Sequence, residues 1–536
     1  MKNAINLPEI SEAERPLLVD RLLIIISQQQ ETIVRLEELI EKLKEEIAHL
    51  KNHKSRPKIS PSKMEEETEN RDSDEERSSK DSSEKKKSGS KKKRLTIHKE
   101  ETIKADGVPE GSIFKGYQEY LVQDLKIEPF NTLYRLEQWQ RPDGTYVIAK
   151  VPESQRGSHY GPTLRGYILH QYHHQHVTQP LVLEQLWEWD IEISSGQLNR
   201  ILTEDKEAFH KEKDEILSVG KEVSGHLQTD DTGARHKGKN GYCTYIGNDL
   251  FAWFKSTESK SRINFLELLG TDHEGYIVNA GGLEYMERHK LPQGKIALLE
   301  SHGGSFETKE QWECHLKGLG ITGERHKAIA TEGALIGSLL AHGFPKDMAI
   351  LSDDAGQFNV FHHALCWIHG ERGVTRLIPM TESQRKGIAW AREQIWDLYA
   401  DLKAYKAEPT EELKLEISER FDEVCSTKTD FESLNEVLKR LHRNKDELLL
   451  VLEKPWVPLH NNVGEQDLRD YVKKRKISGS TRSDPGRQCR DTFASLKKTC
   501  RKHGIRFWDY LMDRLRGKNA ILPLADYIRR AAECKA

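Results

Sequence analysis

Residues 227–234 read LQTDDTGA, and residues 349–358 read AILSDDAGQF. In both stretches an apolar run typical of a β-strand ends on two adjacent aspartates followed by a small residue. Functional groups of an α/β sheet gather at the carboxyl ends of its strands, so we expect both acidic pairs to face one crevice. A third acid, Glu465, lies in LHNNVGEQDLRDYVKKRK (459–476) ahead of a basic helix that Asn461 is placed to cap.

Three carboxylates of this kind suit Mg²⁺, which prefers oxygen ligands and keeps part of its water shell. Two such ions about 3.5–4 Å apart can stabilise the attacking and the leaving oxygen of an in-line phosphoryl transfer. The residues alone leave a second interpretation open, because acid pairs at strand ends often do no more than cap turns.

The surrounding pattern predicts an α/β domain. HLQTDD, GYCTYIG and DLFAWFKS are expected strands, the last two joined at GND, and SRINFLELLG is an expected helix that ends at Gly270. Residues 381–453 have a helical period and are expected to form an inserted helical subdomain. Residues 272–340 are rich in glycine and give no clear prediction.

The amino-terminal third contains two segments of opposite character. Ile26, Ile33, Ile40 and Ile47 are spaced by seven, as are Leu36, Leu43 and Leu50, with Leu22 in their register and Gln29 between them. This heptad pattern predicts a parallel dimeric coiled coil within residues 1–51, although a helix packed on its own domain would look similar. Residues 52–96 are charged and poor in apolar side chains, which predicts a disordered linker.

Two small modules are expected next. Residues 97–155 alternate apolar and polar side chains around a Pro-Asp-Gly turn, which indicates a small β module. Residues 160–222 are expected to form a helix-turn-helix domain, with a serine cap opening its last helix in EISSGQLNRIL. A helix-turn-helix places that helix in the major groove, where Gln197, Asn199 and Arg200 would read DNA. Any small three-helix bundle gives a similar pattern.

Composition limits the remaining classes. The chain of 536 residues is too long for one core. It has no apolar run long enough to span a membrane, and its start lacks a secretory signal. Seven cysteines occur singly, which argues for a reduced cytosolic protein and against a disulfide framework or zinc finger.

The net charge of −3 hides a basic region. Residues 469–506 contain thirteen Lys or Arg residues against three acids. Such a local excess of positive charge favours contacts with phosphates. The expected contacts are Lys473, Lys474, Arg475, Lys476, Arg482 and Arg487.

Taken together, the motifs resemble those of DDE transposases of insertion-sequence family sixty-six (the TnpC type). TDDTGARHKGKNGY is similar to the first motif of that family and aligns Asp230 with its catalytic aspartate, with Asp231 as the variable neighbour. In SDDAGQFN the spacing to Asn359 selects Asp353 over Asp354. CWIHGER matches the Cys-Trp-x-His of the family and includes His369. HNNVGEQDLR aligns Glu465 with the catalytic glutamate.

The chain departs from the family at two kinds of position. His460 stands where the family has aspartate and Val463 where it usually has arginine. Residues 97–152 occupy the position of a zinc ribbon but lack its cysteines.

The resemblance implies an RNase H-like core in two parts, residues 223–380 with an insertion at about 272–340, and residues 454–536. Asp230, Asp353 and Glu465 would be catalytic and bind two Mg²⁺ ions, for which Mn²⁺ can substitute. Asp231, Asp354, His369 and Asn462 would surround them. A metal-activated water would attack a backbone phosphate, and the freed 3′-hydroxyl would attack target DNA.

The implied protein is a bacterial, cytoplasmic and nucleoid-associated transposase that binds terminal repeats and target DNA. It would form a homodimer or higher oligomer through residues 22–50, work with co-encoded accessory proteins, and have no membrane partner. Two alternatives remain open, a catalytically silent DNA-binding or scaffold protein descended from a transposase and an RNase H-like nuclease without strand transfer. The three acids argue against the first, and the coiled coil with the helix-turn-helix argues against the second.

Overall fold

The computed structural model describes residues 26, 29, 33, 97–118, 120–152, 158–271, 273 and 275–534. They belong to two compact units, residues 1–120 and 121–536. In the first unit, residues 26, 29 and 33 are helical and exposed, and residues 97–118 contain turns without helix or strand. Apart from those three residues, the expected coiled coil at 22–50 and the linker at 52–96 lie outside the described residues.

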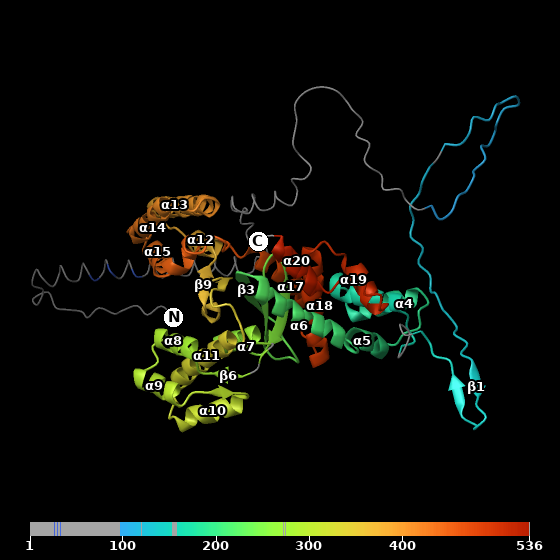
Figure 1. The fold of residues 1–536 in the computed structure, drawn as a ribbon. Helices are drawn as coiled ribbons and strands as arrows, with labels where there is room; N and C mark the ends of the chain where they lie inside the picture. The colour runs from blue at the N-terminus through green and yellow to red at the C-terminus, as the bar shows by residue number, and fades with distance from the viewer. Residues whose placement is uncertain are drawn as a thin grey trace, which may run out of the picture. The chain divides into compact units, whose positions relative to one another are not determined.

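A mixed five-stranded sheet forms the centre of the second unit, in the order β5-β4-β3-β8-β9 (Figure 1). Strands β3 (His226–Gly233), β4 (Tyr242–Gly247) and β5 (Ala252–Thr257) are antiparallel neighbours. Strands β8 (Ala349–Ser352) and β9 (His362–Leu365) run parallel to β3. The expected strands are thus confirmed, including the β4–β5 hairpin, whose turn is closed by Asn248 accepting from the Leu250 amide over 2.8 Å.

Helix α18 (Asp484–Lys502) covers the edge strand β5 with a stripe of polar side chains. The β5 amides of Ala252, Phe254 and Ser256 donate to the side chains of Thr499 (3.2 Å), Ser495 (2.9 Å) and Asp491 (2.7 Å). An uncovered edge strand would present unpaired amides that can pair with another chain. The stripe, spaced by one helical turn, therefore closes this edge from within the chain.

Further helices complete the layers around the sheet. Helix α6 (Glu207–Val223) also contacts β5, and helix α17 (Asn462–Ser478) packs on β3 and β4. Helices α19 (Phe507–Leu515) and α20 (Leu524–Glu533) follow α18 and pack on the helices amino-terminal to the sheet. No helix of the described part of the chain is long and apolar enough to cross a membrane.

Helix α7 (Arg262–Leu269) ends at Gly270 as expected. The glycine-rich segment at 272–340, whose sequence allows no clear prediction, follows α7 and forms a small layer of helices. Its elements are β6 (Tyr276–Ile277), α8 (Ala280–Arg288), α9 (Gln293–Ser301), β7 (Ser305–Phe306), α10 (Lys309–Gly318) and α11 (Glu324–Ala341). A Cβ on Gly282 of α8 would lie 2.4 Å from the Gly333 carbonyl of α11. Part of the glycine content therefore reflects the close packing of these two helices.

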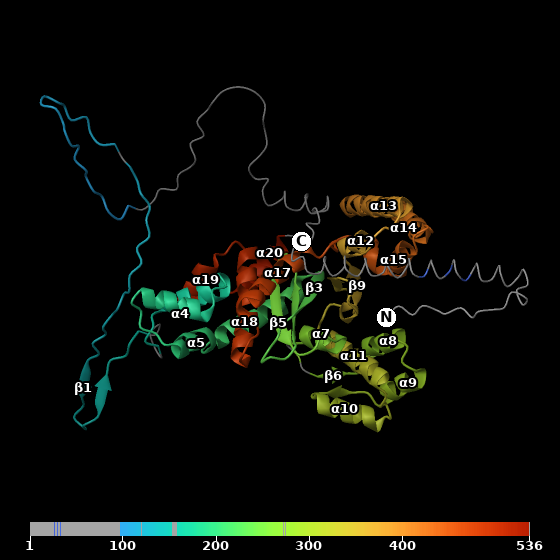
Figure 2. The same cartoon turned by 180° about the vertical axis from the view of Figure 1, so that it is seen from behind.

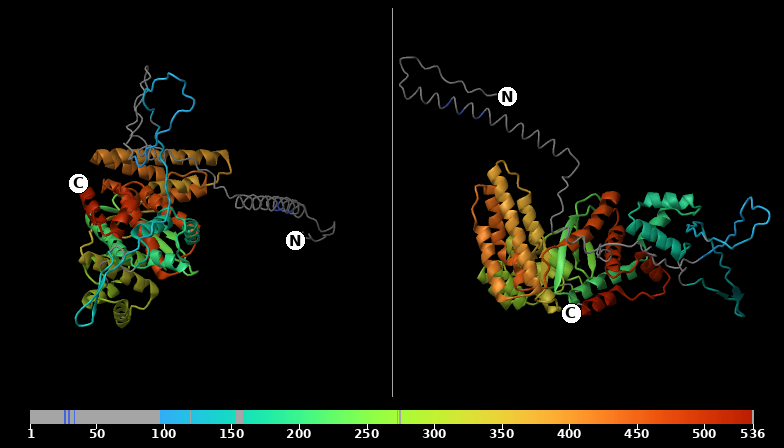
Figure 3. Two further views of the ribbon diagram at one scale, coloured as in Figure 1. Left: turned by 90° about the vertical axis from the view of Figure 1, so that its right-hand side faces the viewer. Right: turned by 90° about the horizontal axis from the view of Figure 1, so that it is seen from above.

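The expected inserted helices follow β9 in the chain. They are α13 (Glu382–Ala407), α14 (Glu411–Ser426), α15 (Glu432–Arg443) and α16 (Lys445–Leu448), and α12 (Trp367–Thr375) precedes them. Figures 1 and 2 place α12–α15 and α8–α11 on opposite sides of β9, and Figure 3 shows α14 and α15 packed alongside the long α13.

The part of this unit that precedes the sheet begins with a hairpin of β1 (Gln138–Gln140) and β2 (Tyr146–Ile148), whose side chains are exposed. Then come α3 (Pro162–Leu169), a π-helical turn η3 (His170–His174), α4 (Gln179–Glu188) and α5 (Ser195–Thr203). Ser194 caps α5 by accepting from the Gln197 amide over 3.2 Å, as the sequence predicts.

Candidate active site

Asp230 and Asp353 lie on neighbouring parallel strands. The β3–β8 ladder pairs His226 with Ala349 and Gln228 with Leu351. Continued by two residues, the same register sets Asp230 beside Asp353, where β8 has just ended. Residues at equal register on parallel strands face the same side of a sheet, so both carboxylates belong to one edge, as the sequence predicts.

Glu465 reaches this edge because the start of α17 is anchored to β3. The Asn461 side chain, 1% exposed, donates through Nδ2 to the Thr229 carbonyl over 2.9 Å. The Gly464 amide donates to Gln228 Oε1 over 3.2 Å. Asn461 occupies the N-cap position, but its side chain does not bond to the helix. The expected cap is therefore wrong in its chemistry, since the side chain ties the helix to the strand.

The pKa of Asp230 is raised, chiefly by burial. Burial raises it to about 7, with further contributions from the charges of Asp353, Asp231 and Glu465. A buried carboxylate close to others is stabilised either by a proton or by a cation. The site therefore has the electrostatic character of a cation site.

A hydrogen-bonded network that begins at the buried Ser352 fixes the main chain of Asp353. Ser352 Oγ donates to the Asp353 carbonyl over 2.6 Å and lies 2.8 Å from His363 Nε2 on β9. His363 Nδ1 lies 2.9 Å from Glu447 Oε1 on α16, which also accepts from Asn359. Oδ1 of Asp353 itself is buried without a hydrogen-bond partner. Its main chain is thus fixed, while one carboxylate oxygen is left for an external ligand.

Helix α12 places the guanidinium of Arg372 and the imidazole of His369 near Glu465. Arg372 Nη1 donates to Glu465 Oε1 over 3.3 Å, and His369 Nε2 lies 3.7 Å from the same oxygen. Burial lowers the pKa of His369, although the charges of Glu465 and Asp353 act against this. Cys366 and Trp367, which precede them, are core residues at 1% and 4% exposed.

The donor set fits Mg²⁺ in chemistry, because it consists of carboxylate oxygens with one buried oxygen left unpaired. Across the described residues, no three His, Cys, Asp or Glu side chains lie close enough together to form a ready cluster. Such a cluster is not required, since Mg²⁺ is commonly held by one or two carboxylates together with substrate phosphates and water.

The neighbours expected around the site divide into two groups. Asp231 accepts from Gln357 Nε2 over 2.6 Å, and burial raises its pKa. Asp354 is exposed and directed to the helical insertion, where Asn444 donates to it over 3.3 Å. The geometry thus favours Asp353 over Asp354. Asn462 is the first residue of α17, beside the anchor Asn461.

The basic helix contributes fewer free cations than expected. Lys474 is 4% exposed, and its ammonium lies 3.5 Å from the centre of the Tyr172 ring and donates to the Tyr172 carbonyl. The prediction that Lys474 contacts DNA is therefore wrong. Arg475 donates to Thr232 Oγ1 and the Gly233 carbonyl, holding the end of β3. Arg487 pairs with Asp484, whereas the remaining expected contacts, Lys473, Lys476 and Arg482, are exposed.

The three expected readers of α5 differ in availability. Gln197 is committed to the capping box, where its Oε1 accepts from the Ser194 amide over 3.0 Å and from the Tyr160 hydroxyl over 2.8 Å. This structural role occupies only Oε1 of the exposed Gln197, so its contact with DNA stays a prediction. Asn199 accepts from Gln179 over 3.3 Å, and the exposed Arg200 lies 3.9 Å from Glu204.

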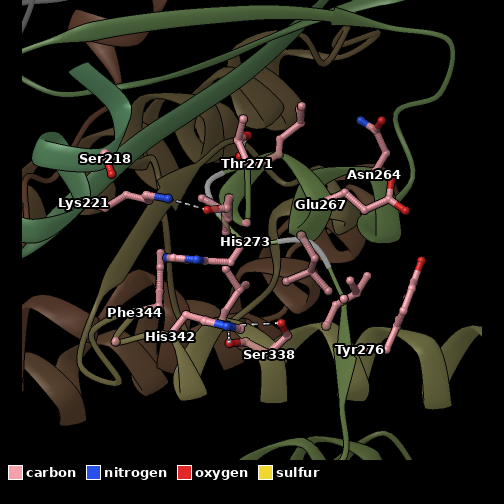
Figure 4. A pocket seen from close by; sticks show the side chains of 18 of the residues that line it. Ser218, Lys221, Asn264, Glu267, Thr271, His273, Tyr276, Ser338, His342 and Phe344 are labelled. Atoms are coloured by element: carbon pink, nitrogen blue, oxygen red, sulfur yellow. Dashed lines mark hydrogen bonds between the residues drawn. The ribbon is translucent and has the colours of Figure 1, made fainter. Parts of the chain in front are cut away.

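A cavity of about 790 Å³ lies elsewhere, between α6, β5, α7 and the end of α11 (Figure 4). His273 and His342 stack in it with ring centres 4.3 Å apart, and Lys221 donates to the Leu269 carbonyl. None of the residues lining this cavity is one of the three carboxylates, so it is separate from the candidate active site.

Sequence reasoning missed Arg372, His363 and Glu447. Arg372 had a usable signal, because it lies one helical turn after His369 and therefore on the same face. His363 and Glu447 come from different elements, and no local spacing links them.

Comparison with known proteins finds a family match and a relative. Residues 349–489 match the family described as "Transposase IS66 family". The matched segment includes Asp353 and Glu465. The chain is also 40% identical over 321 residues to "Uncharacterized protein y4jO" of Sinorhizobium fredii, which covers 59% of this chain and 100% of that protein.

Proposed function

The chain belongs to the IS66 family of transposases, and from this premise we propose that it binds transposon ends and then cleaves and joins DNA strands. In this proposal Asp230, Asp353 and Glu465 are the catalytic carboxylates of an RNase H-like core. The observation that carries it is the register that sets Asp230 beside Asp353, together with the Asn461 side chain that holds the start of α17 against β3 and the raised pKa of Asp230.

The same three residues would hold Mg²⁺, with Mn²⁺ as a substitute. Bound there, the metal would supply activation of the attacking oxygen and stabilisation of charge on the phosphate. Strand cleavage leaves a 3′-hydroxyl, which then attacks a phosphate of target DNA. A bound metal ion would offset the negative charge of the carboxylates, which would otherwise repel the phosphates of DNA.

The chain's own side chains would orient the reaction. Asn461 keeps Glu465 beside Asp230 through β3, and Ser352 fixes the main chain of Asp353. Arg372 presents a guanidinium next to Glu465, from where it can pair with a phosphate in the fork geometry that arginine favours. His369 lies on the same face and closes the site towards α12.

DNA binding would use surfaces on both sides of the core. Asn199 and Arg200 on α5, in a helix-turn-helix, are proposed to read terminal repeats. Lys473, Lys476 and Arg482 are proposed to contact phosphates. We also propose dimerisation through residues 22–50, association with the nucleoid, and cooperation with co-encoded accessory proteins.

The test is a Mg²⁺-dependent cleavage and strand-transfer assay on duplex DNA carrying the terminal repeats of the element. Asp230→Asn, Asp353→Asn and Glu465→Gln should each abolish both steps while end binding persists, since a neutral amide oxygen lacks the negative charge with which a carboxylate holds Mg²⁺. Asp354→Asn is the matched control, because this neighbouring exposed acid points to the helical insertion.

The result also separates the alternatives. Cleavage without joining would indicate a nuclease. Tight end binding with no cleavage by the wild-type chain, with or without accessory proteins, would favour a scaffold protein and contradict the proposal.

A further inference from the structure

The ribbon of β3 and β4 continues beyond the sheet as a basic hairpin, residues 234–241. The Ala234 amide donates to the Gly241 carbonyl over 2.6 Å, and His236 and Lys239 exchange two hydrogen bonds of 3.0 and 2.8 Å. Its tip is a two-residue turn, in which Lys237 has φ 48° and Gly238 has φ 78°. The hairpin extends from the end of β3 that carries Asp230.

Lys237 is an unfavourable residue for this turn. Two-residue turns with both φ angles positive are dominated by Asn-Gly, because a side chain with a Cβ is strained there and Asn tolerates it best. Lysine has no side-chain group that bonds locally to its own backbone. The tip thus carries an ammonium at a conformational cost that Asn would reduce, and a Cβ on Gly238 would meet no atom within 4 Å.

A second segment, residues 479–484, fixes the hairpin in place. His236 pairs with Thr481 as in a parallel strand, through bonds from the Lys237 amide to the Thr481 carbonyl (2.8 Å) and from the Thr481 amide to the Arg235 carbonyl (3.1 Å). The His236 ring lies 2.8 Å from Thr481 Oγ1 and 2.9 Å from Asp484 Oδ1. The hairpin therefore has a defined position relative to α17, which carries Glu465.

The two segments share a strong positive charge. Residues 234–241, segment 479–484 and the preceding Lys476 together contain five Lys or Arg residues and one acid, Asp484. Asp484 is already paired with Lys237 (2.5 Å), His236 (2.9 Å) and Arg487 (3.3 Å). The exposed cations of this surface are Arg235, Lys237, Lys239, Lys476 and Arg482.

We propose that this basic hairpin and segment 479–484 form a second contact surface for the DNA backbone, distinct from the helix-turn-helix. Lys237 is seven positions after Asp230 along this arm of the hairpin, which corresponds to about 20 Å of extended backbone. At about 3.4 Å per base pair, the tip meets phosphates about six base pairs from the cleaved bond. The surface holds the duplex as it leaves the carboxylates, without reading its sequence.

This inference rests on the proposed function but is tested without cleavage. Binding of the full chain to a duplex of unrelated sequence, without metal, is measured by fluorescence anisotropy across a range of salt concentrations. Lys237→Asn should weaken binding about fivefold and lower the slope of log K against log salt by about 0.9, the value for one phosphate contact. Its melting temperature should stay equal or rise, because Asn suits the turn better.

Lys290→Asn is the matched control. Lys290 is also an exposed lysine at positive φ (61°), but it follows α8. It should show the same effect on melting temperature and no change in binding. Wild-type affinity and salt slope in Lys237→Asn would overturn the inference while leaving the transposase proposal standing, whereas a wild-type chain that binds no DNA would overturn both.

Discussion

Arg372 on α12 donates a hydrogen bond to Glu465 on α17 over 3.3 Å, so one of the three candidate carboxylates is already paired with a cation from the protein. The two residues come from either side of the helical insertion. Their pairing means that a metal ion approaching Glu465 competes with a guanidinium for the same oxygen.

Arg372→Gln should therefore tighten metal binding. We expect about a threefold gain in Mn²⁺ affinity, within the range of up to about 1 kcal/mol for partly exposed ion pairs. Isothermal titration of the DNA-free chain measures it. Arg385→Gln, which breaks a pair with Glu382 on the exposed face of α13, should leave the affinity unchanged, and an equal effect of both variants would refute the competition.

Gly464→Ala should displace Glu465. An added Cβ would lie 2.6 Å from Asn461 Oδ1 and 3.1 Å from Tyr245 Cε1, so the start of α17 must move away from β3. We expect a loss of about 1–3 kcal/mol in the free energy of unfolding and at least a tenfold loss of cleavage. Gly318→Ala in α10, where an added Cβ meets nothing within 4 Å, should leave cleavage unchanged and the free energy of unfolding equal or higher. Unimpaired cleavage by Gly464→Ala would contradict the anchoring role.

Glu447→Ala should impair the candidate active site by disrupting the hydrogen-bonded network that fixes the main chain of Asp353. The change removes the acceptor for Asn359 and His363, and leaving buried donors unpaired costs about 1–3 kcal/mol. Glu447→Gln keeps one acceptor oxygen and should recover part of the stability and of the cleavage rate. Thermal unfolding and the cleavage assay measure the two effects, and identical behaviour of both variants would argue against a hydrogen-bonding role.

Lys474→Met should change the pH dependence of stability. Burial lowers the pKa of Lys474 from 10.5 to about 7, with repulsion from Arg490 and Lys497. Between these values the unfolded chain binds more protons than the folded one, so this group makes stability rise with pH. The destabilisation caused by burying the charged ammonium of Lys474 is fully present below pH 7 and absent above pH 10.5. The variant should be more stable at pH 7 and show a flatter rise to pH 9.5 in urea unfolding.

The neighbouring exposed Lys473 supplies the control for that experiment. Lys473→Met makes the same substitution at an exposed position instead of a buried one and should keep the wild-type slope. A Lys474→Met chain with the wild-type slope would show that Lys474 does not titrate abnormally.

Substitutions in α5 should separate stability from recognition. Gln197→Ala breaks the capping box and should lower the free energy of unfolding by about 0.5–2 kcal/mol. Arg200→Ala should leave stability almost unchanged and weaken binding to terminal repeats. The two effects are measured by urea unfolding and by anisotropy. A stable Gln197→Ala chain with lost end binding would support Gln197 as a reader of DNA.

The strands and helices with local signals were predictable from the sequence. The apolar runs before Asp230 and Asp353, the β4–β5 hairpin and the end of α7 at Gly270 follow from periodicity and turn chemistry. The glycine-rich layer was not, because its glycines serve the contact between α8 and α11. Such a contact cannot be inferred before both helices are placed.

Within the site, chemical type was easier to predict than availability. The sequence indicated a basic helix but could not show that Lys474 lies beneath Tyr172, which is about three hundred residues away. It indicated Asn461 as a cap, whereas the strand that takes its hydrogen bond is distant in the chain. Side chains with two possible partners, one local and one remote, are the positions where local rules fail.

The stripe of Asp491, Ser495 and Thr499 on α18 also has a consequence during protein synthesis. The ribosome makes β5 more than two hundred residues before this stripe, so a nascent chain carries an open sheet edge until almost all of it has been translated. Open edges invite pairing with other chains, and distant contacts form slowly. A product of a gene truncated between residues 354 and 464 would contain both aspartates, yet it would lack Glu465 and expose a surface that recruits chaperones and proteases.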